Sequence, residues 1–225
     1  MENNDYIQSI SETAERRTFS SEMRTIKKEK RDDGDSDESL NIIEGYAAKF
    51  NSETVIGYYY QFREKIKKGA FDDVLNDDVR CLFNHSPNYV LARCVEGKGT
   101  LTLSVDKVGL KYSYETPDRQ YARDLQDAIE KGDITQSSFA FEIEEQTWTE
   151  IEGEIPTREI IKFKRLYDVA PVTYPAYADT EVAKRSLDAY KEKSNIKPEI
   201  DESRTAEKRE LNAFDAQIII NSNLD

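Results

Sequence analysis

A chain of 225 residues is long enough for one ordinary domain with polar tails. Charged residues make up 34%, above the ~25% usual in globular domains, and 32 basic against 45 acidic residues leave a net charge of −13. Because binding to a phosphate backbone or to an anionic membrane surface needs clustered cations, this balance argues against nucleic acid and membrane as partners.

The N-terminal part predicts a tail followed by a β-hairpin. Residues 1–20 are polar with few large apolar side chains, and we expect a flexible tail there. Two strand-like stretches between Ser21 and Phe50 flank a very acidic break at residues 32–38. Because Asp, Gly and Ser in such a cluster mark a loop, we expect the two stretches to pair as a hairpin.

The central part combines strands with one helix. Over residues 119–131 the apolar side chains follow the period of an amphipathic helix, and Gly132 stands at its expected end. Period-two alternation and β-branched or aromatic composition predict strands at residues 101–105, 110–114, 134–143 and 160–169. This order of strands, helix and further strands predicts a mainly β (α+β) domain with helices packed outside.

The C-terminal part is expected to be a charged tail over residues 187–225, which leaves residues 21–186 as the domain. A helix is possible at 205–214, and the short apolar patch at 217–220 is a plausible docking element. The chain has no run of about 18 apolar residues that would span a membrane, and its first residues lack the pattern of a secretory signal.

Cysteine and histidine are scarce. Cys81 and Cys94 cannot form a disulfide framework, which predicts a reducing, cytoplasmic setting. Both cysteines are more readily explained as small buried hydrophobic residues than as nucleophiles. With one histidine and no metal-ligand spacing, the sequence predicts neither a metal site nor a cofactor.

His85 is the first candidate for chemistry because an imidazole suits general acid–base work at neutral pH. It follows an apolar run that ends at Phe83 and precedes Pro87, so we expect it where a strand leaves the core. The scaffold would hold the residue there while its ring faces solvent. An ordinary hydrogen-bonded loop histidine is the alternative.

Ser137 and Ser138 are the candidate nucleophiles, which need an adjacent base because a serine hydroxyl is a poor nucleophile by itself. Phe139 and Phe141 share one face of the predicted strand, and Ser138 lies on the other with its hydroxyl pointing outward. Ser137 shares the phenylalanine face and should be less available. A purely structural serine is the alternative.

Asp168 is the best-placed acid to orient an imidazole, since it lies near the end of a predicted strand, just before a break at Ala170 and Pro171. The alternative is a strand-end aspartate that binds turn amides. The acidic pairs at 72–73 and 77–78 could imitate a carboxylate dyad, but their neighbours are typical of solvated loops.

Five blocks of the chain resemble the prohead maturation serine proteases of tailed bacteriophages, which are distantly akin to the herpesvirus assemblins. They include FNHSP at 83–87, SFAF at 138–141 and DVAPVTYPAY at 168–177. The remaining similarity lies at residues 45–51, 62–71, 90–93 and 132–134. The blocks occur in the family's order, and the likeness covers roughly residues 40–186.

The resemblance implies an assemblin-like β-barrel surrounded by helices. It also implies a serine endopeptidase that acts in the host cytoplasm, inside the immature capsid or prohead. Such proteases cut the scaffolding portion from the major coat protein and cleave themselves. Carried over by position, Ser138 is the nucleophile, His85 its base and Asp168 the third member, where many relatives carry Glu.

Two other functions stay open. A catalytically inactive capsid assembly factor could have the same fold, although all three polar residues are present. A small cytosolic serine hydrolase is disfavoured because there is no Gly-x-Ser-x-Gly motif. The acidic loop and the C-terminal tail would be sites of self-processing or of docking to the shell, with plain solubility as the alternative.

Overall fold

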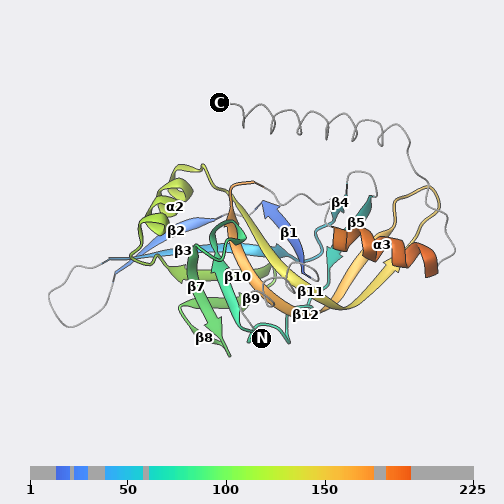
Figure 1. Ribbon diagram of the computed structural model, residues 1–225, viewed down its shortest axis with the longest axis horizontal. Coiled ribbons are helices and arrows are strands. Elements are labelled where there is room, and N and C mark those ends of the chain that lie inside the picture. Colours follow the sequence, from blue (N-terminus) through green and yellow to red (C-terminus); the bar gives the residue numbers. More distant parts are fainter. Residues whose placement is uncertain (1–13, 21–22, 30–38, 58–60, 175–180, 194–225) are drawn as a thin grey trace, which may run out of the picture.

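The computed structural model describes residues 14–20, 23–29, 39–57, 61–174 and 181–193 (Figure 1). Within them 53% of residues lie in strands and 16% in helices, so the predicted mainly β class is confirmed. None of the described helices is long and apolar enough to cross a membrane. The acidic loop at 32–38, the possible helix at 205–214 and the apolar patch at 217–220 lie outside the described residues.

Two sheets and two α-helices make up the described structure. The larger sheet has the strand order β1-β11-β12-β6-β7-β8; in addition, β5 pairs with β12 and β4 pairs with β5. The smaller sheet has the strand order β2-β3-β10-β9. All pairs are antiparallel except that β5 and β6 both run parallel to β12. The elements in chain order are β1 (Glu15–Ser20), β2 (Arg24–Glu29), β3 (Ser39–Lys49), β4 (Thr54–Ile56), β5 (Phe62–Ile66), β6 (Val79–Leu82), the 3-10 turn η1 (Phe83–His85), β7 (Val90–Val95), β8 (Lys98–Gly99), β9 (Leu101–Val105), β10 (Gly109–Glu115), α2 (Gln120–Lys131), β11 (Gln136–Thr149), β12 (Thr157–Val172) and α3 (Glu181–Lys193).

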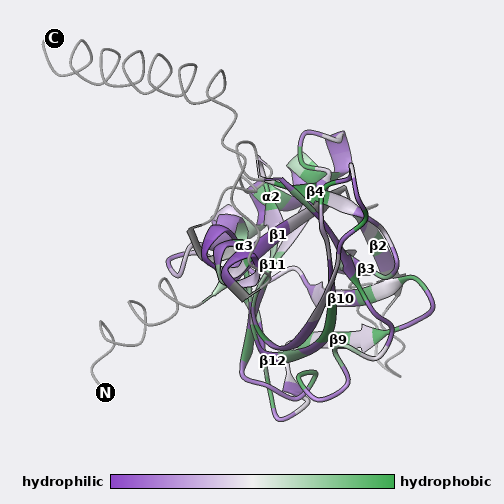
Figure 2. Cartoon of the chain, turned by 90° about the vertical axis from the view of Figure 1, so that its right-hand side faces the viewer, coloured by the Kyte–Doolittle hydropathy of each residue, from purple (hydrophilic) through white to green (hydrophobic). Residues whose placement is uncertain are grey.

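The two sheets enclose one core (Figure 2). β1 contacts β3, while β7 and β8 contact β9, so both sides of the large sheet approach the small one. No ladder among the described residues joins the two sheets, and the closed barrel implied by the resemblance therefore stays a prediction. The largest apolar side chains of this core are Phe71, Tyr112, Phe139, Phe141 and Phe163.

The strand β11 places Phe139 and Phe141 on one face and Ser138 on the other, as its alternation predicts, and both faces are buried there. Phe139 and Phe141 are fully buried and their rings stack with centroids 4.6 Å apart. Ser138 and Ala140 alternate with them on the opposite face. Ile143, two residues beyond Phe141, is only partly buried because the pairing with β12 shifts register on both sides of it.

The predicted helix is confirmed as α2, whose buried side chains Ala122, Leu125 and Ile129 form one stripe. Gly132 ends this helix in the left-handed conformation, at φ +81°, which a residue without Cβ adopts at little cost. The predicted N-terminal hairpin is confirmed as the antiparallel pair β2 and β3.

Described elements lie beyond both predicted domain boundaries. β1 lies within the expected flexible tail of residues 1–20, yet it pairs with β11 along its length. Its charged side chains are typical of a solvated segment, but Arg158 and Glu64 of the large sheet pair with Glu15 and Arg17. At the other end α3 runs to Lys193, past residue 186, because Leu187 is buried against Ile56 and Phe62.

Candidate active site

The structure brings together the three residues that sequence reasoning selected. His85 Nε2 lies 2.7 Å from Ser138 Oγ, and His85 Nδ1 lies 2.6 Å from Asp168 Oδ1. Because a carboxylate oxygen only accepts hydrogen bonds, Nδ1 carries the proton in this arrangement and Nε2 is left to accept from the serine hydroxyl. Acid, imidazole and hydroxyl thus form one hydrogen-bonded chain.

The register of three strands explains why these side chains meet. Ser138 on β11 lies opposite Ala170 on β12, and Asp168 lies two residues before Ala170 on the same face. Diagonal neighbours on a sheet face are about 7–8 Å apart, a gap that an imidazole with two hydrogen bonds can span. β6 pairs with β12 at Asp168 and Val169, so the turn that follows β6 carries His85 to this gap.

The backbone that presents His85 is held in an uncommon conformation. Asn84 at φ 55° and His85 at φ 57° both lie in the left-handed region, which costs a residue with a Cβ of order 1–3 kcal/mol. Asn84 ties this turn to the end of β12 with two hydrogen bonds. Its Oδ1 accepts from the Thr173 N–H at 2.8 Å, and its Nδ2 donates to Thr173 Oγ1 at 3.1 Å.

Sequence reasoning missed the role of Asn84. A signal was available, because Asn tolerates the left-handed region better than most residues and stands directly before the single histidine. Its partner Thr173 lies 89 positions away, and no local pattern indicates that pairing.

Two sequence-based expectations about the site were wrong. His85 was expected to face solvent and the Ser138 hydroxyl to point outward into it. Ser138 has no exposed surface, and the side chains of His85 and Asp168 are only 7% and 8% exposed. Ser138 does lie on the face opposite Phe139, but η1 carries His85 over this face and Thr18 of β1 lies beside it.

The expected strand break after Asp168 was also wrong. β12 continues through Ala170 and Pro171 to Val172, and Pro171 lies opposite Ser137. A proline is tolerated here because β6 pairs with β12 only up to Val169, so the missing N–H leaves no partner on that side unsatisfied.

Ser137 belongs to the interior rather than to the site. Its Oγ lies 2.8 Å from the hydroxyl of Tyr112 on the facing sheet, and both residues are fully buried. Burial raises the pKa of Tyr112 well above its usual range, so this hydroxyl stays neutral. Ser137 is therefore separated from His85 by the thickness of β11.

The two cysteines are free and buried, as predicted. Burial, and then the nearby Asp168 carboxylate, raise the pKa of the Cys81 thiol well above its usual value. The reactive thiolate is therefore disfavoured.

The acidic pairs do not form a carboxylate dyad. Asp78 accepts two hydrogen bonds from Arg93, which lower the pKa of that carboxyl. Asp77 accepts from the N–H of Leu166 at 3.0 Å and so connects its loop to β12.

A second buried polar group, which we call the four-charge cluster, was not predicted. It consists of Glu15 and Arg17 on β1, Glu64 on β5 and Arg158 on β12. The Arg17 Nε–Glu64 Oε1 and Arg158 Nη2–Glu15 Oε2 distances are both 2.7 Å. Burial alone would raise the pKa of Glu15, but Arg17 and Arg158 outweigh it and lower this pKa to about 2.

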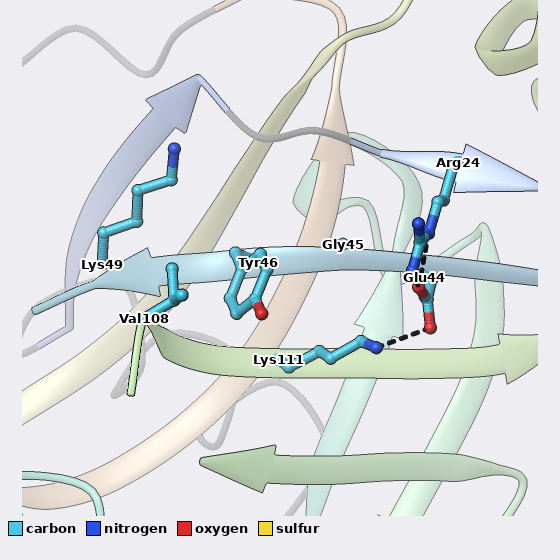
Figure 3. A pocket seen from close by; sticks show the side chains of 7 residues that line it. All are labelled: Arg24, Glu44, Gly45, Tyr46, Lys49, Val108 and Lys111. Carbon is cyan, nitrogen blue, oxygen red and sulfur yellow. Dashed lines mark hydrogen bonds and ion pairs between the residues drawn. The ribbon is translucent and has the colours of Figure 1, made fainter. Parts of the chain in front are cut away.

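A pocket of about 400 Å³ lies on the small sheet (Figure 3), and its lining does not include His85, Ser138 or Asp168. In this pocket Glu44 forms ion pairs with both Arg24 and Lys111, and Tyr46 donates a hydrogen bond to Asp106. The lining contains no serine, threonine, cysteine or histidine, so the pocket has no counterpart of the Ser138–His85 pair. Its lining residues are Arg24, Glu44, Gly45, Tyr46, Lys49, Val108 and Lys111.

A hydroxyl, an imidazole and a carboxylate joined in this order can support acyl-transfer chemistry, because the imidazole lies within reach of the hydroxyl proton and the carboxylate can orient the imidazole. The family model for caudovirus prohead serine proteases matches residues 24–193. The chain belongs to this family, and the resemblance drawn from the sequence is confirmed. His85, Ser138 and Asp168 fall inside the matched segment, whereas β1 precedes it.

Among solved structures, the chain is similar to the bacteriophage T4 capsid assembly protease gp21. The two are 13% identical, with 72% of this chain and 98% of that chain covered and a TM-score of 0.44. No curated protein matches this chain.

Proposed function

We propose that this protein is a serine endopeptidase of phage capsid maturation, with Ser138 as nucleophile, His85 as general base and Asp168 as the orienting acid. Membership of the prohead protease family supports the biological role. The observation that carries the chemical assignment is the pair of hydrogen bonds, 2.7 and 2.6 Å long, that join Ser138 through His85 to Asp168.

The proposed reaction follows from these contacts. His85 Nε2 takes the proton of Ser138 Oγ as that oxygen attacks the peptide carbonyl carbon, and the same proton then goes to the departing amine. A water molecule, deprotonated by His85, hydrolyses the acyl-enzyme ester and restores Ser138. Asp168 holds the Nδ1–H tautomer throughout. Donors to the oxyanion, either backbone amides or an arginine, would contribute about 2.7–4 kcal/mol each.

The proposed substrate is the major coat protein with its scaffolding segment, and the protease itself is a second substrate. The proposed place of action is the interior of the prohead in the host cytoplasm. Family membership supports this setting, because the family is described as prohead serine proteases of tailed phages.

Co-expression with the cognate coat protein tests the proposal. Ser138→Ala should abolish release of the scaffolding segment, as read by mass spectrometry of the coat protein. Ser137→Ala is the matched control, because it removes the neighbouring hydroxyl from the opposite face of the same strand. Continued coat cleavage by Ser138→Ala would refute the nucleophile assignment.

The second candidate is a catalytically inactive assembly factor on the same fold. The full burial of Ser138 is the observation that favours it, because a peptide carbonyl cannot reach a covered hydroxyl. Absence of coat cleavage by the unaltered protein in assembled proheads would select this alternative.

A further inference from the structure

The nucleophile is covered although its hydrogen-bonded chain is complete. Ser138 has no exposed surface, so part of the surrounding structure must move before a peptide can approach its Oγ. Thr18 on β1 lies directly opposite Ser138 in the antiparallel pair of β1 and β11. β1 is thus the neighbouring strand at the position where the reaction would occur.

β1 is also an edge strand of the large sheet, where β11 is its neighbour. Without it, the edge of β11 from Gln136 to Phe141 would present unpaired N–H and C=O groups beside Ser138. An extended peptide binds such an edge by adding itself as a strand. The place that β1 occupies is therefore a place that fits an extended substrate peptide.

The four-charge cluster holds β1 on the sheet, but its composition allows β1 to separate with both of its charged side chains. β1 contributes one acid, Glu15, and one base, Arg17, to the cluster. If both leave together, the remaining Glu64 and Arg158 still neutralise each other through the Nε–Oε2 contact of 2.8 Å. No uncompensated charge stays behind, so the penalty for breaking a buried ion pair by removing one partner does not arise.

We propose that β1 is an internal inhibitory strand: it occupies the substrate-binding edge of β11, and its withdrawal opens the site at Ser138. This inference depends on the proposed protease function. The family match begins at residue 24, so β1 lies outside the segment that defines the protease family, as expected of an added control element.

Loosening β1 tests the proposal in one direction. In the full-length chain, the double variant Glu15→Ala/Arg17→Ala removes both anchors from β1 and leaves the Glu64–Arg158 pair intact. We expect purified variant to cleave coat protein at least tenfold faster than the unaltered protein. Arg24→Ala/Glu44→Ala is the matched control, because this ion pair fastens β2 to β3 instead and its loss should leave the rate unchanged.

A disulfide that holds β1 on β11 tests the proposal by the opposite change. It also tests the inhibitory role of β1 if the loosened variant fails to fold. Arg16 and Ala140 lie directly opposite each other in the β1–β11 pair, and the native cysteines are buried. In Arg16→Cys/Ala140→Cys, the oxidised protein should cleave coat protein at least tenfold more slowly than the same protein after reduction.

The outcomes separate the two proposals. Equal cleavage by the oxidised and reduced forms, or a folded loosened variant that is no faster than the unaltered protein, would overturn the inhibitory role of β1 while the protease function stands. If no form of the protein cleaves coat protein, the proposed function itself fails, and the inhibitory strand fails with it.

Discussion

Two buried polar groups belong to the large sheet and to the turn η1 that follows its strand β6, and they are built on different principles. The four-charge cluster contains two acids and two bases, and every charge in it contacts an opposite one. The triad of His85, Ser138 and Asp168 instead has one imidazole between an acid and an alcohol. The first arrangement fixes charges in place, whereas the second leaves one proton that can move along the chain.

The difference predicts opposite consequences of substitution. Removing one member of the cluster leaves a buried charge without a partner, which destabilises the fold. Altering a member of the triad without changing its shape leaves the packing intact but interrupts proton transfer, so activity falls while the fold persists.

The largest effect is expected from Asp168→Asn. The amide keeps the size of the carboxylate but favours the wrong imidazole tautomer, and we expect the rate of coat cleavage to fall about 10⁴-fold. The free energy of unfolding in urea should change by less than about 1 kcal/mol. If the free energy of unfolding fell by as much as the activation free energy of coat cleavage rose, Asp168 would be an ordinary structural aspartate.

Arg158→Ala should have the largest effect on stability. Arg158 is fully buried and contacts both Glu15 and Glu64, so its removal leaves two carboxylates without this partner. We expect about 3–5 kcal/mol of destabilisation by urea denaturation. A change below about 1 kcal/mol would mean that the cluster does not hold these strands together.

The stability due to Glu15 should depend on pH. The pKa of Glu15 is lowered to about 2 by Arg17 and Arg158, with Glu64 also in the cluster. A lowered pKa means that the contribution is fully present above the ordinary value of 4.5 and is lost as pH falls toward 2.

Urea denaturation of the unaltered protein and of Glu15→Gln between pH 7 and pH 2 measures this contribution. The difference between the two free energies of unfolding should shrink as pH falls below about 4.5. A difference that stays constant over this range would contradict the assignment.

The smallest effect is expected from the turn that presents His85. Asn84→Ala removes both hydrogen bonds to Thr173 and leaves a poorly tolerated residue at φ 55°. We expect about a tenfold fall in kcat with little change in KM, because the base is misplaced while substrate contacts remain. Asn84→Gly, which restores the backbone freedom alone, should recover part of the loss; a change confined to KM would argue against a positioning role.

The same contrast explains what could be predicted from the sequence. His85 has no competitor, and the alternation around Phe139 and Phe141 places Ser138 on the opposite face by local geometry alone. β1 and the four-charge cluster could not be predicted, because Glu15 and Arg158 are 143 positions apart in the sequence. Without knowledge of its partners, a charged strand has the composition of a solvated tail. The burial of Ser138 was missed for the same reason, since it depends on elements that only the tertiary fold brings beside it.

The most direct test of the central claim is to locate the covalent adduct that a small fluorophosphonate forms with the Glu15→Ala/Arg17→Ala variant, in which the loosened β1 should uncover Ser138. We predict a single adduct by mass spectrometry, on Ser138, that is lost in His85→Ala because the hydroxyl then has no base. An adduct on Ser137, or full modification of Ser138 in the absence of His85, would contradict the assignment of nucleophile and base.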